Sequence, residues 1–64
     1  MNYAVSYRSS TGAETVSVFQ DERLAIEAAR QLLKADPTAK QAKSKDHADS
    51  LLARQVPQVT VWEL

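Results

Sequence analysis

The only histidine of the chain, His47, lies where acid–base or metal chemistry is conceivable. It stands between Asp46 and Asp49, and histidines beside carboxylates often act as general bases or metal ligands. The supporting spacings Glu-x-x-His and His-x-x-His are absent. We favour a solvated histidine in the first turn of a short helix, where acidic residues stabilise the positive end of the helix dipole. We therefore expect no catalytic residue, no metal and no cofactor.

Phosphate chemistry has equally little support in the sequence. Gly12 is the only glycine, so a glycine-rich phosphate-binding loop cannot be built. A chain of 64 residues also leaves little room for an enclosed pocket. We expect that the protein is not an enzyme.

A basic arm is the second group that could bind a ligand. Residues 34–50 contain no Val, Ile, Leu, Met, Phe, Trp or Tyr. The basic side chains in question are Lys40, Lys43, Lys45 and, farther along, Arg54. They could contact nucleic-acid phosphates or an acidic protein surface. Three aspartates dilute the charge and no aromatic is interleaved for base stacking, which favours a solvated loop. Unpatterned segments of this length are often functional or disordered, so a plain connector and a recognition loop both stay open.

Length and composition limit what can position these residues. The chain is long enough for one domain, residues 1–64. A domain this small buries only about 60% of its unfolded surface, so its stability is marginal. The chain has no cysteine, which removes disulfides and thiolate-bound metals as reinforcement and leaves association with another chain. Its 8 basic and 8 acidic residues cancel, whereas nucleic-acid-binding modules usually carry a basic excess.

The sequence gives no indication of a membrane segment or an export signal. No apolar run approaches the ~20 residues that cross a bilayer. The N-terminal residues MNYAVSYRSS lack a charged region followed by an apolar stretch, which a secretory signal would need. We expect a cytoplasmic protein.

Two changes of period define the first half of the chain. Apolar and polar residues alternate before and after the turn-forming segment SSTGA, which contains Gly12. This pattern predicts a β-hairpin over residues 3–19. Residues 21–35 then follow a helical period, which predicts an amphipathic helix capped by Asp21. Pro37 disfavours helical backbone at Asp36 and should end the helix there.

The second half predicts a short helix and a strand. The helix covers about residues 46–55, with Asp46 as its cap, and Pro57 prevents its continuation. The last residues, QVTVWEL, have the β-branched and aromatic content of a strand. The expected fold is an α+β domain of order β-β-α-α-β. Its three-stranded, mainly antiparallel sheet has strand order 2-1-3, with both helices on one face.

The last strand is apolar on both sides, so its orientation decides which side chains stay exposed. The preferred arrangement turns a set of valines toward the helices: Val5, Val16, Val18, Val59 and Val61. Trp62 and Leu64 then lie on the opposite face with Phe19 and Ala4. In the reverse arrangement Trp62 belongs to the core, as large aromatics commonly do. A third possibility is a symmetric dimer that stacks two such faces and so buries Trp62 between the two copies.

The leading functional hypothesis is protein binding. Tryptophan is enriched at binding hot spots, so we assign the contact to Phe19, Trp62 and Leu64. The charged side of the first helix is assigned with them: Arg23, Glu27, Arg30 and Lys34. A nucleic-acid-binding accessory protein that uses Lys40, Lys43, Lys45 and Arg54 is the alternative.

The layout of a hairpin, the segment FQDERLAIEAARQLL and a final strand is similar to that of small proteins from phages, plasmids and other mobile elements. The T7-type phage inhibitors of host RNA polymerase resemble it in size and strand–helix layout, and several anti-CRISPR proteins in scale. This resemblance implies a small regulator or inhibitor that covers a surface of a larger protein machine.

Overall fold

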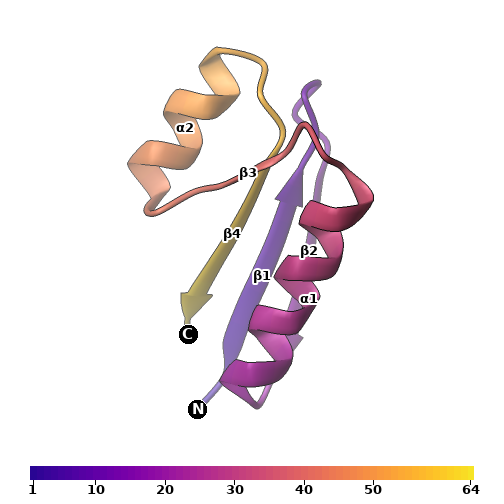
Figure 1. The fold of residues 1–64 in the computed structure, drawn as a ribbon. Helices are drawn as coiled ribbons and strands as arrows, with labels where there is room; N and C mark the ends of the chain where they lie inside the picture. Colours follow the sequence, from indigo (N-terminus) through magenta and orange to yellow (C-terminus); the bar gives the residue numbers. More distant parts are fainter.

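The computed structural model describes residues 1–64 as a mixed sheet with two helices (Figure 1). The elements are β1 (Tyr3–Arg8), β2 (Glu14–Phe19), α1 (Glu22–Ala35), β3 (Lys40–Gln41), α2 (Lys45–Ala53) and β4 (Gln58–Glu63). The predicted α+β class is confirmed. The sheet has four strands in the order β2-β1-β4-β3, so the predicted three-stranded sheet of order 2-1-3 is wrong. The additional strand, β3, has only two polar residues and therefore no alternation that would mark it.

The predicted hairpin is present and its turn explains the only glycine. β1 and β2 pair antiparallel, from Tyr3 opposite Phe19 to Arg8 opposite Glu14. Within the loop of residues 9–13, the Ser9 N–H donates a 2.9 Å hydrogen bond to the Ala13 carbonyl. Gly12 has φ +93°, a backbone conformation that side chains with a Cβ rarely adopt.

Helix α1 forms as the periodicity predicts. The Asp21 side chain caps it by accepting a 2.9 Å hydrogen bond from the Arg23 N–H, and Asp36 is its C-cap. Ala25 and Ala29 lie against the sheet, where their small side chains let the helix approach closely. With two valines of the sheet they form the fully buried core: Val5, Ala25, Ala29 and Val59.

The hairpin register reverses the expected placement of the β2 side chains. Because Tyr3 lies opposite Phe19, Phe19 points to the α1 side and packs against the core. Val16 and Val18 point to the other face and are exposed. The predictions that Val16 and Val18 belong to the core and Phe19 to the face opposite the helices are wrong. The length of the hairpin loop sets this register, and alternation within one strand does not reveal it.

β4 pairs antiparallel with β1 on the side away from β2. Ala4 lies opposite Trp62 and Val5 opposite Val61. Val59 and Val61 pack on the α1 side, as predicted, and Trp62 points to the other face. The Ala42 N–H donates a 2.8 Å hydrogen bond to the Val59 carbonyl, and β3 runs parallel to β4 along its outer edge.

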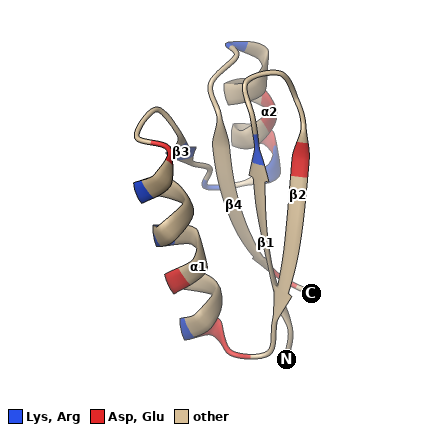
Figure 2. Ribbon diagram, turned by 90° about the vertical axis from the view of Figure 1, so that its right-hand side faces the viewer, with Lys and Arg blue, Asp and Glu red and all other residues tan.

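Helix α2 lies on the opposite side of β4 from α1 (Figure 2), so the prediction that both helices cover one face is wrong. The connection from β3 to the parallel strand β4 must cross one face of the sheet, and α1 already occupies the other. A second small core holds α2 in place: Ala42, Ala48, Leu51 and Val56. Ser44, rather than Asp46, caps α2, because its hydroxyl accepts a 3.1 Å hydrogen bond from the His47 N–H.

Candidate functional site

The face of the sheet that points away from α1 is built from rows of residues across three strands. We call it the open face, and its rows are Val18–Ala4–Trp62 and Val16–Ser6–Thr60. The central strand contributes the small residues of each row, while the outer strands contribute larger ones. Ala4 and Ser6 are therefore buried although they point away from the core. The open face is a trough with a floor of small side chains.

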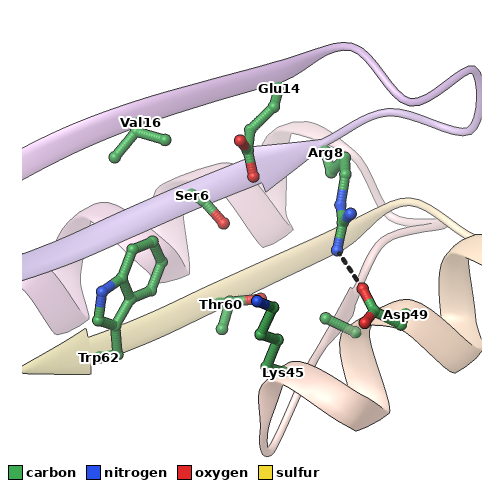
Figure 3. Close-up of a pocket in the computed structure, with 9 residues that line it drawn as sticks. Ser6, Arg8, Glu14, Val16, Lys45, Asp49, Thr60 and Trp62 are labelled. Carbon is green, nitrogen blue, oxygen red and sulfur yellow. Dashed lines mark hydrogen bonds and ion pairs between the residues drawn. The ribbon is translucent and has the colours of Figure 1, made fainter.

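The trough deepens into a cleft where α2 approaches the sheet (Figure 3). The cleft has a volume of about 640 Å³. Its lining residues are Ser6, Arg8, Glu14, Val16, Lys45, Ala48, Asp49, Thr60 and Trp62. Val16 and Trp62 lie on its two sides and α2 lies across one end (Figure 3). The cleft therefore combines two apolar walls with polar groups at the α2 end.

Arg8 connects the sheet to α2 through one ion pair. Its Nε donates a 3.0 Å hydrogen bond to the Gln58 side-chain oxygen, and its Nη2 lies 3.4 Å from the Asp49 carboxylate. Gln58 is buried, and its amide also donates a 3.3 Å hydrogen bond to the Val56 carbonyl. Arg8 thus contacts both Gln58 of β4 and Asp49 of α2, and its side chain forms part of the cleft wall between them.

Two charged residues of the cleft have no ion-pair partner. Glu14, on β2, and Lys45, at the start of α2, form none of the ion pairs in the structure. Both are exposed. They leave one negative and one positive group at the rim of the cleft, free to contact a ligand.

Large apolar side chains are unusually exposed on the open face. Val16 is 50% exposed, Val18 57% and Trp62 40%. Leu64, which follows β4, is 63% exposed, and its N–H donates a 2.8 Å hydrogen bond to the Asn2 carbonyl. An exposed apolar group rimmed by polar residues is typical of a contact surface.

The residues predicted to bind protein do not form one surface. Trp62 lines the cleft and Leu64 is exposed, but Phe19 packs into the core beneath α1. The structure places the predicted charged residues of α1 on its exposed side: Arg23, Glu27, Arg30 and Lys34. Helix α1 itself covers the other face of the sheet. Two of these charged residues approach each other, with Arg30 Nη1 4.0 Å from the Glu27 carboxylate. A partner that covers Trp62 would not reach this side of α1.

The basic arm is only partly brought together. Lys40 lies in β3, Lys43 lies between β3 and α2, and Lys45 begins α2. Arg54 is the C-cap of α2, and the nine residues of this helix separate it from Lys45 by roughly 13 Å. Figure 2 shows the basic residues at both ends of α2. Of the four, Lys45 alone lines the cleft.

His47 has a structural role at the start of α2. Its Nδ1 accepts a 3.0 Å hydrogen bond from the Lys43 N–H, which closes the turn before the helix. No group of three or more His, Cys, Asp or Glu side chains has the arrangement of a metal site.

Sequence reasoning missed most of the cleft. The sequence pattern assigns Val16 to the core and gives no site role to Arg8, Glu14 or Asp49. The signal for the cleft is the apolar pair in β2 opposite small residues in β1. This signal can be read only when the register of the hairpin is known.

Comparisons of the chain with protein-family models, with curated proteins and with solved structures find no match. Neither helix is long and apolar enough to span a membrane.

Proposed function

We propose that this chain is a non-enzymatic protein-binding module whose open face covers a surface of a larger protein. The observation that carries the proposal is the position of Trp62. Its side chain forms a wall of the cleft, is 40% exposed and points away from the core. A half-exposed tryptophan beside a cleft is well placed to become a hot spot when a partner removes it from water.

The composition of the open face fits the anatomy of a protein interface. Val16, Val18 and Trp62 supply its exposed apolar area on either side of the small floor residues, and the unpaired charges of Glu14 and Lys45 lie at the rim of the cleft. Protein interfaces combine an apolar core that lacks charge with a polar rim. The trough would accept a protruding apolar side chain or ridge of the partner, and the rim charges would orient it.

The mode of action we propose is that of a small regulator or inhibitor, of the kind encoded by phages or mobile elements. A domain of 64 residues can block a binding surface of a larger machine simply by occupying it. The similarity in size and layout to phage inhibitors of host RNA polymerase and to anti-CRISPR proteins motivates this part of the proposal.

The test is affinity capture from lysate of the source cells with three versions of the tagged chain, each with and without nuclease. The versions are the wild type, Trp62→Ala and Leu24→Ala. Leu24 is a matched control because it is an exposed leucine of α1, on the other side of the sheet. We expect one stoichiometric protein that the wild type and Leu24→Ala retain and Trp62→Ala loses, with nuclease making no difference.

Two outcomes would overturn the proposal. Material that disappears after nuclease treatment would favour nucleic-acid binding through Lys40, Lys43, Lys45 and Arg54. That mode would also show a steep loss of affinity with salt, because phosphate contacts release counterions. A partner retained equally by Trp62→Ala would place the contact away from the open face.

A further inference from the structure

The outer edge of the sheet at β2 is open along its whole length. Strand β2 pairs only with β1, and Figure 2 shows no other element beyond it. All of its residues except Phe19 are exposed. The sequence ETVSVF contains no lysine and no proline, the residues that commonly protect an edge strand from pairing with another chain.

Two backbone hydrogen bonds show which groups of β2 face this edge. The Ser9 N–H bonds to Ala13, opposite it in the hairpin, and the Leu64 N–H bonds to Asn2, opposite it in the pairing with β4. In antiparallel pairs the bonding direction alternates along each strand. The odd-numbered residues of β1 therefore bond to β2, and the even-numbered ones to β4. It follows that Val16 and Val18 direct their N–H and C=O groups outward.

The outward-facing strand is complementary to a second copy of itself. When two β2 strands run antiparallel with Ser17 opposite Ser17, Val16 of each copy lies opposite Val18 of the other. Thr15 then lies opposite Phe19, and Glu14 opposite Gln20. No charge faces a like charge, and the small serines occupy the central pair, where antiparallel strands place side chains closest. Moving the register by two residues toward the hairpin loop would instead set each Glu14 opposite Val18.

We propose that β2 pairs with β2 of a second copy in this register, so that two sheets join into one of eight strands. The twofold axis passes between the two Ser17 residues. Because a twofold axis perpendicular to the sheet keeps each face on its own side, the open faces of both copies become continuous. The four valines at the junction, Val16 and Val18 of each copy, then form the centre of one larger apolar surface. This inference rests on the β2 edge and goes beyond the proposed function.

Ser17 provides a test that does not touch the open face, because its side chain points to the α1 side and is exposed. We would measure the mass in solution of the wild type, Ser17→Lys, Ser17→Glu and their equimolar mixture by sedimentation equilibrium, at concentrations up to about 1 mM. In the proposed register each single variant places like charges directly opposite each other, whereas the mixture places opposite charges together. Ser10→Lys and Ser10→Glu, in the exposed hairpin loop, are the matched controls.

We expect the wild type and both Ser10 variants to approach twice the 7.1 kDa mass of the chain as concentration rises. Each Ser17 variant alone should keep the mass of the monomer, half that of the wild-type dimer. The equimolar mixture of the two variants should regain the mass of the dimer. A wild type that stays monomeric throughout would overturn the proposal. A dimer that persists in both Ser17 variants would also overturn it. A dimer that dissociates in Trp62→Ala would indicate that the two copies associate by stacking their open faces instead. Circular dichroism of each variant verifies that the fold is intact.

Discussion

The hydroxyl of Tyr7 donates a 2.6 Å hydrogen bond to the carboxylate of Asp36, which lies 29 residues later at the C-terminal end of α1. The other carboxylate oxygen accepts bonds from the Thr38 hydroxyl at 2.6 Å and the Thr38 N–H at 3.1 Å. The bonds from Thr38 and then Tyr7 hold the pKa of Asp36 below its usual value of 3.8. The same hydrogen bond to Asp36 raises the pKa of Tyr7. This group ties the central strand to the end of the helix.

Removing the Tyr7 hydroxyl should make the free energy of unfolding less sensitive to acidification. Because the pKa of Asp36 is lower in the folded state, its stabilisation is complete above pH 3.8 and is lost as the pH falls through the folded pKa. In Tyr7→Phe the pKa of Asp36 should rise toward its usual value. We expect a lower free energy of unfolding at neutral pH and a shallower decline on acidification, measured by urea unfolding. Tyr3→Phe, which leaves Asp36 intact, is the control, and a Tyr7→Phe profile that parallels the wild type would contradict the assignment.

Gly12 should tolerate few replacements, because its φ is +93°. A Cβ at this position would meet no atom within 4 Å, so the cost is one of backbone conformation alone. We expect Gly12→Ala to lower the free energy of unfolding by about 1–2 kcal/mol. Asparagine visits this region more readily, so Gly12→Asn should cost less. Thermal unfolding of the two variants checks this order, and equal losses would argue against it.

Leu51 anchors α2, since it is fully buried beside Ala42 and Ala48. We expect Leu51→Ala to cost about 2–5 kcal/mol, a large part of the stability of so small a domain. Amide exchange at Ala42, whose N–H bonds to Val59 between β3 and β4, should accelerate with it.

The neighbouring Leu52 is only half-buried and serves as the control for this prediction. Leu52→Ala should cost distinctly less and leave the Ala42 amide better protected. Equal costs for the two variants would show that the small core beneath α2 does not hold that part of the fold.

The single tryptophan provides a direct test of how β4 is oriented. Trp62 lies on the open face and is 40% exposed, so acrylamide should quench its fluorescence readily in the folded protein. Binding of a partner to the open face should then shift its emission to shorter wavelength. Strong protection from acrylamide in the free, monomeric chain would indicate that Trp62 belongs to the core after all.

Local patterns sufficed for the elements that carry strong periodicity. The alternation of residues 3–8 and 14–19 and the helical period of residues 21–35 each determine one element. The period identifies the type of element even for β2, whose valines stay exposed. The strand β3 escaped prediction, since Lys40 and Gln41 are polar and join the sheet only because α2 returns the chain alongside β4.

The site was harder to predict because it depends on registers between strands. The preferred orientation of β4, with its valines toward the helices, places Trp62 on the exposed face, but both sides of this strand are apolar and the pattern alone leaves the reverse orientation open. The exposure of Val16 and Val18 follows from the pairing of Tyr3 with Phe19, which no single segment encodes. The Arg8–Asp49 ion pair joins residues 41 positions apart and requires the position of α2 as well.

The loop of residues 9–13 gives this fold a short mutational route to a different binding surface. Shifting β2 by one position against β1 exchanges the two sides of β2. A change in this loop that shifts the register by one position would therefore turn Val16 and Val18 beneath α1 and bring Phe19 to the side of Trp62. A lineage carrying this hairpin could thus replace a valine-lined trough with an aromatic one in a single genetic event, without substituting any residue of the surface itself.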